Sequence, residues 1–398
     1  MKGLPLQSFD FDRPINRLGS HSVKWDGLKG RFGEHAVGAL PMWVADMEFA
    51  APPAVNAALA AAVEHGVHGY YGDPSAYLAA IKGWMKRRHG WEIDEGWILT
   101  TAGVVNGVNL AIQAYCQPGD GVIVQQPIYH PFAPAIRNNG CHVVGNLLSY
   151  ADGRYGMDLD ALAKSVDAKT RMLILCSPHN PCGRVWSKDE LTAIAEFCLE
   201  RGILIVSDEI HHDLVFDGPH TVLATISPEV AARTVTFTST SKTFNLAGGH
   251  TGNAIISDPE LRRAYVRQME RCGMMSSNRF GYLMATAAYA EGEEWLEALL
   301  VYLKGNRDYI DRMVAERLPG VRSPRLDATY LSWLDFSGTG MTDAELVKRF
   351  EHDAKVICNH GASFGPGGSG FMRLNFASPR AMVEEAMERI VGAFGDLQ

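Results

Sequence analysis

Residues 238–248 read TSTSKTFNLAG, and they follow directly on an apolar, β-rich run, Thr234 to Thr238. A lysine that stands among hydroxyl side chains at the end of a strand, as Lys242 does, is suited to form a Schiff base with a carbonyl group. Ser239 and Lys242 also match the S-x-x-K pattern of serine acyl-transfer enzymes, but the supporting S-D-N and K-T-G elements are absent from the sequence. We therefore predict that Lys242 carries the chemistry of this protein.

This stretch belongs to a long region in which short β-rich runs alternate with helical patterns. The β-rich runs are residues 98–101, 122–125, 142–146, 172–176, 203–207, 234–238 and 254–257. Helical stretches such as Val104 to Cys116 and Lys188 to Glu200 lie between them. Nearly continuous apolar strands separated by helices are typical of a sheet that is covered on both faces. The pattern predicts a large α/β domain over residues 50–285, with a mostly parallel seven-stranded sheet that binds its ligand at the carboxyl ends of the strands.

The rest of the chain predicts a second, smaller domain. After residue 285 the sequence shows helices, a strand at 330–336, a helix at 342–352, a strand at 371–376 and a final helix from Pro379. Residues 1–49 are mixed in character, with glycine, proline and charges that interrupt any periodicity. We expect residues 1–49 and 286–398 to form an α+β domain together.

A glycine-rich loop lies between two helical stretches at the start of the large domain. The double proline at 52–53 begins the first helix, over residues 54–65, because proline is tolerated in a first turn. The second helix covers residues 75–88. The loop HGVHGYYGDP between them is predicted to expose Tyr70 and Tyr71.

Size and composition favour a globular protein that acts on a small molecule. With 398 residues and 46% apolar content, the chain can build one large or two ordinary cores. Its 37 basic and 45 acidic residues give a net charge of −8 without long blocks of one sign, which disfavours nucleic acid or a membrane surface as the main partner. Seven cysteines without a C-x-x-C pair, no signal-like N-terminus and no apolar run of 18 residues predict a cytoplasmic protein with reduced thiols.

Several strand ends carry residues that together fit pyridoxal phosphate (PLP), a cofactor held by a lysine. Its phosphate needs backbone N–H groups at a helix start, and Gly103, Val104 and Val105 stand at a strand-to-helix turn. Its ring needs an aromatic face, which Tyr129 in QPIYHPF supplies, and its phenolic oxygen needs a donor such as Asn180, held between two prolines. Taken alone, the strand-to-helix turn and Tyr129 are better explained as an ordinary turn and a packing contact, and the rigid loop at Asn180 is also a common kind of turn. Their combination predicts a PLP site.

Asp208 follows the very apolar run GILIV and is predicted to be buried. A buried carboxylate needs a cationic or proton-bearing partner, and the protonated pyridine nitrogen of PLP is such a partner. Metal binding is the alternative for the acids and histidines of this stretch, which are Asp208, Glu209, His211, His212 and Asp213. Because adjacent histidines on a strand point to opposite faces, we predict no metal site here.

Two features near the C-terminus bear on ligand binding. Residues 365–370, GPGGSG, formally match the dinucleotide-binding pattern G-x-G-x-x-G, but a strand follows them where that pattern requires a helix. We therefore reject a dinucleotide site. Arg373 on that strand has a planar guanidinium suited to bind a substrate carboxylate through two hydrogen bonds, with a structural salt bridge as the alternative for a lone arginine.

These stretches closely resemble the MalY/PatB-type PLP enzymes, which are cystathionine β-lyase-like C-S lyases in the fold type I group of class I/II aminotransferases. The resemblance runs from about residue 20 to residue 390, in matching order and spacing. It rests on PMWVADMEF, HGVHGYYG, TAGVV, QPIYHPF, SPHNPCGRVW, SDEIHHDL, SKTFNLAG and GFMRLNFASPR. It implies the fold type I transferase fold, PLP as cofactor and a cytoplasmic homodimer.

The resemblance also implies a role for each matching position around the cofactor ring. Lys242 would hold PLP as a Schiff base, and Asp208 would pair with the pyridine nitrogen. Asn180 and His211 would lie near the phenolic oxygen. Tyr129 would stack on the ring.

At the other end of the cofactor, the resemblance implies that the phosphate is bound by the loop after the first strand and by the lysine loop. The residues concerned are Gly103, Val104, Val105 and Ser239. Tyr70 of the partner subunit would complete this phosphate site across the dimer interface.

The resemblance implies that Arg373 holds the α-carboxylate of an amino-acid substrate. The chain departs from the usual pattern at a few positions near the site. Cys182 stands where Thr is common, Ser177 where Asn is common, Ala102 where Pro is common, and Gly249-His250 where Leu-Gln is common. None of these changes removes a catalytic group, and Cys182 and His250 are candidates for adaptation to a particular substrate.

The activity that the resemblance implies is a C-S β-lyase reaction on cystathionine, cysteine or a related S-substituted cysteine. The amine of Lys242 would remove the Cα proton, a thiol would leave from Cβ, and the remainder would hydrolyse to pyruvate and ammonia. Two alternatives stay open at this point. One is an aminotransferase that uses a 2-oxo acid acceptor, and the other is a regulatory protein in which PLP is structural.

Overall fold

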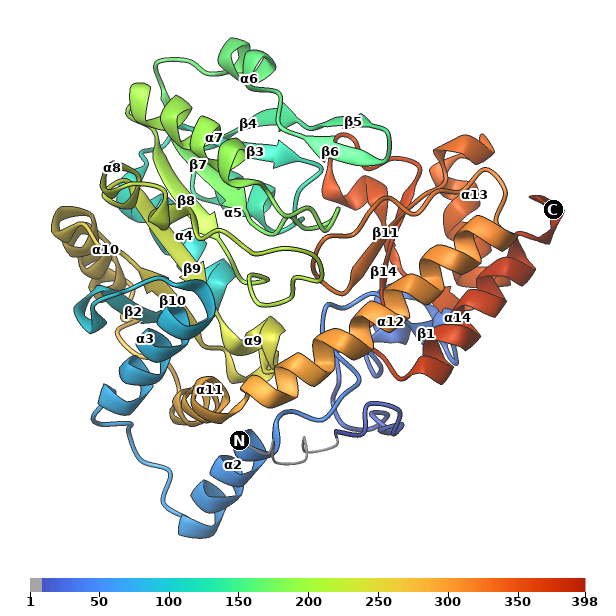
Figure 1. Ribbon diagram of the computed structural model, residues 1–398, viewed down its shortest axis with the longest axis horizontal. Helices are drawn as coiled ribbons and strands as arrows, with labels where there is room; N and C mark the ends of the chain where they lie inside the picture. Colours follow the sequence, from blue (N-terminus) through green and yellow to red (C-terminus); the bar gives the residue numbers. More distant parts are fainter. Residues whose placement is uncertain (1–8, 398) are drawn as a thin grey trace, which may run out of the picture.

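The computed structural model of the chain describes residues 9–397, so residues 1–8 of the predicted small domain and residue 398 lie outside the described part. Its centre is a seven-stranded sheet with the strand order β2-β10-β9-β8-β7-β3-β4 (Figure 1). The strands are β2 (Ile98–Thr101), β3 (Gly121–Gln126), β4 (His142–Leu147), β7 (Thr170–Cys176), β8 (Leu204–Asp208), β9 (Thr234–Thr238) and β10 (Gly252–Ile255). Every predicted β-rich run forms one of these strands. Strand β10 runs antiparallel to the other six, which confirms the mostly parallel sheet.

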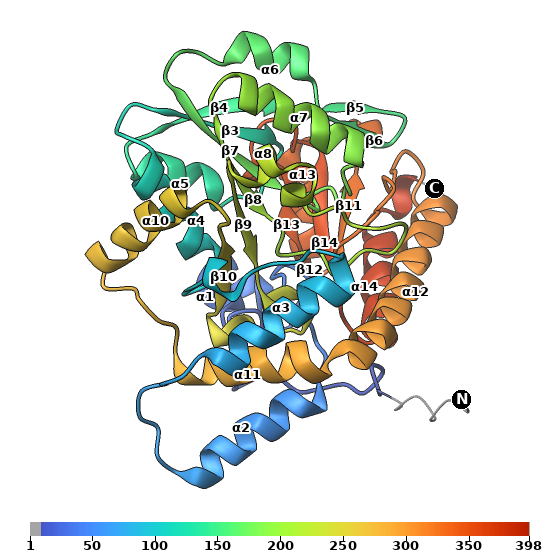
Figure 2. The same cartoon turned by 60° about the vertical axis from the view of Figure 1, so that its left-hand side comes forward.

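Helices cover both faces of this sheet because successive residues of its strands point to opposite sides. In β3, Val122 and Val124 pack into one apolar core, whereas Ile123 packs into the other. The helices α4 (Val104–Tyr115), α5 (Phe132–Asn138) and α10 (Pro259–Arg271) cover the first face. The opposite face is covered by α6 (Leu159–Ser165), α7 (Lys188–Glu200) and α8 (Pro228–Ala231), as Figure 2 allows the reader to follow.

Helix α7 illustrates how local sequence determines these elements. Ser187 caps its first turn by accepting a hydrogen bond from Glu190 N at 3.1 Å, and the Glu190 side chain accepts one from Ser187 N at 2.8 Å. This reciprocal capping box satisfies two N–H groups that have no partner within the helix. The apolar positions of the predicted helix, Leu191, Ile194 and Cys198, are all buried against the sheet.

The C-terminal part contains a three-stranded antiparallel sheet beside two long helices. The strands are β11 (Leu331–Asp335), β14 (Phe371–Asn375) and β13 (Asn359–His360), and the helices are α12 (Glu293–Arg317) and α14 (Arg380–Ala393). The predicted helix 342–352 is α13 (Asp343–Lys348), continued by a π-helix over Arg349–Asp353. The widened turn lets the neighbouring residues Phe350 and Glu351 both face inward.

The N-terminal segment joins this C-terminal part through a short parallel pairing. Strand β1 (Leu40–Pro41) pairs with β12 (Val356–Ile357). One apolar core nevertheless runs across the predicted domain boundary, since Trp84 of α3 (Ser75–His89) and Leu303 of α12 belong to the same cluster. The division at residues 49 and 285 therefore stays a prediction.

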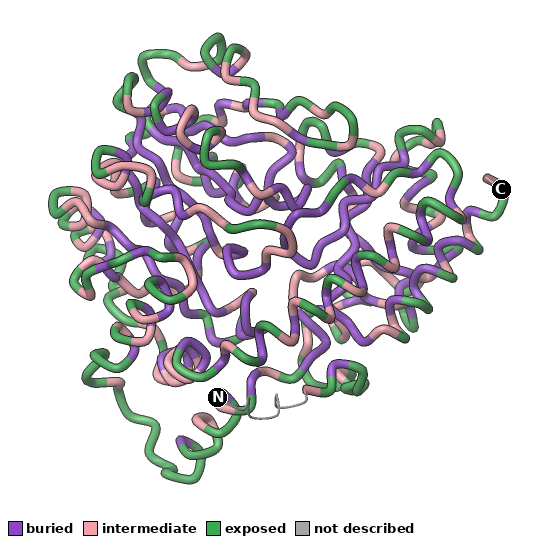
Figure 3. The backbone as a smooth tube through the Cα atoms, in the orientation of Figure 1, coloured by how far each residue is buried: buried purple, intermediate pink, exposed green. Residues whose placement is uncertain are grey.

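Helix α2 (Pro53–His65), the loop 66–74 and α3 follow the predicted order. Figures 1 and 3 show α2 and this loop projecting from the body of the molecule, with most of their residues exposed. Tyr70 is fully exposed, as predicted. The prediction for Tyr71 was wrong, because its ring stacks on that of Tyr282 at 4.5 Å with an interplanar angle of 11°. The apolar face of Tyr71 is thereby removed from water.

Two further observations concern the environment of the chain. Across residues 9–397, no helix combines the length and the apolar content that crossing a bilayer requires. All seven cysteines are free thiols, and Cys272 is the exposed one.

Candidate active site

The carboxyl ends of the parallel strands bring most of the predicted site residues to one edge of the central sheet. Cys176 at the end of β7 lies opposite Asp208 at the end of β8, and Asp208 lies opposite Phe237 near the end of β9. The loops that follow these strands carry Asn180 and Ser239. Because β10 is antiparallel, its first residue lies at this same edge.

Gly103, Val104 and Val105 stand where β2 passes into α4, at the same edge. Gly103 has φ +93°, a conformation that side chains disfavour, so the turn requires glycine. Gly252, at the start of β10, packs directly below this turn. A Cβ at position 252 would lie 3.0 Å from the carbonyl carbon of Gly103 and 3.1 Å from Val104 N. A side chain at position 252 would therefore crowd the start of α4, and glycine allows β10 to approach this turn closely.

Ser239 lies next to this turn. Its Oγ accepts a hydrogen bond from Ser241 N at 3.0 Å and lies 2.7 Å from the carbonyl oxygen of Thr251, to which it donates. Thr251 immediately precedes β10 and Gly252. The hydroxyl of Ser239 is thus fixed beside the first turn of α4, which agrees with the predicted grouping.

The side chain of Lys242 is half-buried, and its Nζ donates a hydrogen bond to the carbonyl oxygen of Ala45 at 2.6 Å. Burial of the amine is the largest effect on its pKa, which falls to about 8. Asp46 and Asp208 oppose this shift, and the positive charge of Arg373 adds to it. A pKa near neutrality makes a substantial neutral fraction available, and the neutral amine is the form that acts as nucleophile or base.

Tyr330 is a residue of this site that the sequence did not single out. Its hydroxyl donates to the carbonyl oxygen of Ala45 at 2.9 Å, so it shares an acceptor with Lys242. The Asn375 side chain holds this backbone in place by donating to the carbonyl oxygens of Val44 and Asp46, both at 2.6 Å. The only available signal was the acid within the apolar segment PMWVADMEF; Tyr330 itself looked like a strand residue.

Asp208 is buried, as predicted, and few groups of the chain stabilise a negative charge on its carboxyl. Its carboxyl group accepts one hydrogen bond from the described residues, from Ile210 N at 3.1 Å, and forms no ion pair with them. Burial raises its pKa to about 7, and the charge of Glu209 adds to this effect, while the Ile210 bond and Lys242 oppose it. A carboxyl in this state is complementary to a cationic or proton-bearing group brought by a ligand.

Arg373 is the opposite case, a buried cation without an acid. Its guanidinium donates to Asn180 Oδ1 at 2.9 Å, to the Trp43 carbonyl oxygen at 3.2 Å and to Asn359 Oδ1 at 2.5 Å. Its Nε is buried without a partner, and no acid among residues 9–397 pairs with it. Burial lowers its pKa to about 10. The salt-bridge alternative was wrong, and the unpaired guanidinium is complementary to a carboxylate.

Three further predicted residues surround this centre. The Asn180 side-chain oxygen is used by Arg373, while its amide N–H groups make no hydrogen bond to the described residues and are left for another acceptor. Tyr129 is half-buried, with its ring edge-on to Phe132 at 5.6 Å. His211 is buried with Nδ1 unpartnered, and burial, followed by the charges of Lys242 and Arg373, keeps its pKa well below the usual value.

The stretch that follows Asp208 is a turn, so the prediction that His211 and His212 lie on a strand was wrong. The two rings still face different surroundings. His211 faces the Tyr330 ring, with the centroids 6.1 Å apart, whereas His212 stacks on His89 at 4.3 Å and lies 3.1 Å from Asp213. The turn therefore separates an active-site side from a second, fully buried polar network.

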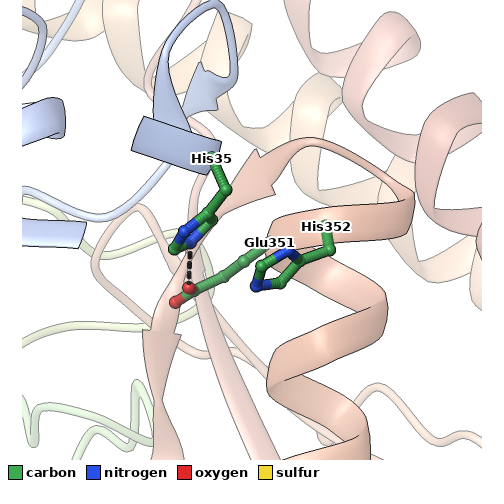
Figure 4. A group of neighbouring side chains, drawn as sticks. All are labelled: His35, Glu351 and His352. Atoms are coloured by element: carbon green, nitrogen blue, oxygen red, sulfur yellow. Dashed lines mark hydrogen bonds and ion pairs between the residues drawn. The ribbon is translucent and has the colours of Figure 1, made fainter. Parts of the chain in front are cut away.

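Two clusters bring potential metal ligands together, but their geometry fits ion pairs and hydrogen bonds better than chelation. One is His89, His212 and Asp213; the other is His35, Glu351 and His352. Figure 4 shows the His35 and His352 rings face to face, with centroids 4.1 Å apart and planes tilted by 16°. An imidazole binds a metal in its ring plane, so the lone pairs of stacked rings run side by side and do not meet at one ion. Of the two stacked histidines, only His35 forms a hydrogen bond with Glu351, at 2.8 Å.

The remaining predicted positions do not reach the centre within a single chain. Tyr70 lies on the exposed loop after α2, so its assignment to a neighbouring subunit's site stays a prediction. Cys182 packs in the core on the α7 face of the sheet, and His250 is exposed with φ +45°.

With the geometry described, comparison with known proteins identifies the family. The family model for aminotransferase class I and II matches residues 44–390. Cystathionine beta-lyase PatB of Bacillus subtilis is 42% identical over 96% of this chain and 99% of its own, and protein MalY of Escherichia coli is 33% identical over 97% and 98%. The crystal structure of cystalysin from Treponema denticola superposes with a TM-score of 0.95 at 37% identity, covering 98% of this chain and all of that one. This chain therefore belongs to the class I and II aminotransferase family.

Proposed function

We propose that this protein is a PLP-dependent C-S β-lyase that converts cystathionine, cysteine or a related S-substituted cysteine into a thiol, pyruvate and ammonia. The observation that carries the proposal is a set of three ionisable groups that form no ion pair with the described residues. The Lys242 amine has a lowered pKa, Asp208 is buried without a cation, and Arg373 is buried without an acid. The relative PatB is named a cystathionine beta-lyase, and the structure of cystalysin contains PLP.

The described residues fit both the ring end and the phosphate end of PLP. Asp208 offers an uncompensated carboxyl for a protonated ring nitrogen, and Asn180 has free amide N–H groups for an oxygen. His211 offers a buried nitrogen without a partner. Gly103 and Gly252 together leave the first N–H groups of α4 free of any overlying side chain, as an approaching phosphate requires. We assign Val104, Val105 and Ser239 to the same phosphate site.

The mechanism divides the work between the cofactor and these side chains. Bound PLP supplies an electron sink for the Cα of the amino acid, which no side chain of the protein offers. Arg373 binds and orients the substrate α-carboxylate, with its fork held by Asn180 and Asn359. The neutral amine of Lys242 removes the Cα proton, and its lowered pKa suits that transfer near neutral pH. Asp208 keeps a proton at the ring nitrogen.

The loss of the thiol from Cβ also needs a proton donor near the sulfur. Lys242 holds the Cα proton after it has acted as base, and Tyr330 shares its acceptor, the carbonyl oxygen of Ala45. We assign the return of that proton to the departing sulfur to Lys242. Tyr330 orients the lysine through this shared oxygen.

The test of the proposed function is a pyruvate assay with cystathionine in the absence of any 2-oxo acid. We expect pyruvate and ammonia in equal amounts from the purified protein. The Lys242→Ala variant should lose at least about 10²–10⁴-fold in turnover, as expected for removal of the base, together with the visible absorbance of lysine-bound PLP. Lys348→Ala, at an exposed position of α13, is the matched control and should behave as the wild type.

The same assay separates the two alternatives. Product that forms only when a 2-oxo acid is added would assign the chain to transamination. A folded, PLP-loaded protein that is inert towards cystathionine, cysteine and S-alkyl cysteines would assign PLP a structural role in a regulatory protein. Full activity of Lys242→Ala would contradict the assignment of the lysine.

We further propose that the protein works in the cytoplasm as a homodimer in which Tyr70 of the partner subunit contacts the PLP phosphate. In support, Tyr70 is fully exposed, and Val63 and Val67 are exposed at the same end of α2. A cluster of exposed apolar side chains is typical of an interaction surface. Sedimentation should give the mass of two chains, and Tyr70→Phe should weaken PLP binding without changing that mass.

A further inference from the structure

A second unpaired cation lies beside the proposed active site. Arg31, on the short helix α1 (Leu28–Phe32), is exposed, and its guanidinium carbon lies 4.9 Å from the centroid of the Trp43 ring. Among residues 9–397 it forms no ion pair. The carbonyl oxygen of the same Trp43 accepts a hydrogen bond from Arg373 at 3.2 Å. Trp43 thus contacts Arg31 with its ring and Arg373 with its backbone.

His130 lies near Arg373, beside the same Phe364 ring. Its ring lies 5.5 Å from that of Phe364, and the guanidinium carbon of Arg373 lies 4.8 Å from the same Phe364 ring. Its Nδ1 is buried and has no hydrogen-bond partner among the described residues. Burial, followed by the charges of Arg373 and Arg31, lowers the pKa of His130 to about 4. The imidazole is therefore neutral in the physiological range, and neither Arg373 nor Arg31 forms an ion pair with an acid among the described residues.

Two acids of the surrounding segments, Asp46 and Glu351, already have partners within the chain. Asp46, which lies close enough to Lys242 to act on its pKa, forms an ion pair with Arg17 at 2.8 Å. Glu351 accepts hydrogen bonds from His35 and His360. Two guanidinium groups without acids, separated by a tryptophan and a neutral imidazole, are complementary to a substrate with an anion at each end.

We propose that Arg31 is a specificity-determining residue that binds a carboxylate on the thiol fragment of the substrate. The neutral His130 ring forms a hydrogen bond with the part of the substrate that lies between Arg373 and Arg31. The inference rests on the proposed lyase function and names its substrate class, S-substituted cysteines whose leaving thiol carries a second anionic group. Arg373 binds the α-carboxylate, and Arg31 binds the distal one. Contact with the Trp43 ring restricts the Arg31 side chain, so less conformational freedom is lost when the distal carboxylate binds.

The experiment compares two substrates of almost equal shape, S-(2-carboxyethyl)-L-cysteine and its amide, S-(2-carbamoylethyl)-L-cysteine. Both release pyruvate in a lyase reaction, and they differ only in the charge of the leaving thiol. With the PLP-loaded enzyme we expect kcat/KM to favour the acid, and the preference to weaken as salt is added. Arg31→Gln should reduce the ratio of the two kcat/KM values about tenfold, and Arg31→Lys should restore part of it.

Lys29→Gln is the matched control, because it removes one positive charge from the same short helix and its partner is the exposed Glu34. It should leave the ratio at the wild-type value. An active lyase whose ratio is the same in wild type and Arg31→Gln would overturn the role of Arg31 alone. A wild-type enzyme that forms no pyruvate from either substrate would overturn the lyase function, and the inference with it.

Discussion

Asp208 ends strand β8 and Asp213 lies in the turn after it; both are buried, and their surroundings are opposite. Asp213 accepts hydrogen bonds from Trp84 Nε1 at 3.1 Å, His89 Nε2 at 2.8 Å and Thr243 Oγ1 at 2.8 Å. Burial alone would raise its pKa, but the neighbouring His212 and His89 outweigh burial and hold it well below the usual value. Asp208 accepts one backbone hydrogen bond, and its pKa rises to about 7.

The difference shows that the end of β8 and the turn after it carry one acid for a ligand and one acid for the structure. The Asp213 network ties α3 to the turn and to the Lys242 loop, because its donors come from Trp84, His89 and Thr243. The Asp213 carboxylate has hydrogen-bond donors within the chain, so the network contributes to stability. The Asp208 carboxyl has one such donor and no ion pair, so its burial lowers stability until a ligand supplies a partner.

The largest stability effect should come from breaking the satisfied acid. Asp213→Asn places an amide N–H₂ among donors that need an acceptor and removes the charge that pairs with the histidines. We expect a loss of about 3–5 kcal/mol in the free energy of unfolding, measured by urea denaturation of the PLP-loaded protein. Asp353→Asn, at an exposed position, is the control. A loss below 1 kcal/mol, taking roughly the cost of one ordinary hydrogen bond as the limit, would contradict the comparison.

Asp208→Asn should produce the converse result. We expect kcat/KM to fall about 10²–10³-fold, a loss typical of removing one preorganised electrostatic partner, because the ring nitrogen is no longer kept charged. The cofactor-free protein should be as stable as the wild type or more stable, since an uncompensated carboxyl has been removed. Steady-state kinetics and urea denaturation check the two halves. A variant that loses stability but retains its activity would reverse the roles of the two aspartates.

The pH dependence of the cofactor-free protein should sharpen the contrast. The folded pKa of Asp208, about 7, exceeds its unfolded value of about 3.9, so the folded chain holds a proton that the unfolded chain has lost in that window. Its contribution to the free energy of unfolding therefore decreases as pH rises, by about 2–3 kcal/mol between roughly pH 5 and pH 8. Asp213 acts in the other direction, and only in acid, because its folded pKa is lowered.

The measurement compares wild type with Asp208→Asn at both pH values, so that all other titrating groups cancel. We expect the stability of the wild type relative to the variant to drop by that amount at the higher pH. An unchanged difference would show that Asp208 is already compensated within the chain.

The smallest expected effect comes from removing one of the donors to Asp213. Trp84→Phe keeps the ring in the core and deletes the hydrogen bond from Nε1, while His89 and Thr243 still donate to the carboxylate. We expect a loss of about 1–2 kcal/mol in thermal or urea unfolding and little change in kcat/KM. A large loss of activity would mean that this network positions the lysine.

Much of the fold was readable from local sequence, and the reasons are physical. All seven β-rich runs are strands, and α7 spans the predicted Lys188–Glu200, because buried strands and capped amphipathic helices leave strong periodic patterns. The antiparallel direction of β10 left no such trace, since strand direction depends on how the chain returns to the sheet. The exposure of Tyr71 was predicted wrongly because a glycine-rich loop gives no sign of the distant Tyr282 on which it stacks.

The candidate site shows the same division. Lys242, Asp208, Asn180 and Arg373 could be picked out because each is a polar residue at the end of, or within, an apolar run. Tyr330 could not, because its role depends on the carbonyl oxygen of Ala45, which belongs to a segment far away in the sequence.

The sequence by itself determined the strand and helix pattern, the family resemblance and the choice of Lys242 as the candidate for the reactive lysine, because these depend on residue type and spacing along the chain. Only the tertiary structure decided which charges are balanced. It surrounded Asp213 with donors from α3 and from the Lys242 loop, and it left Asp208, Arg373 and Arg31 without an ion pair among the described residues. Charge balance in a protein interior depends on which distant segments meet, and that is a property of the folded chain.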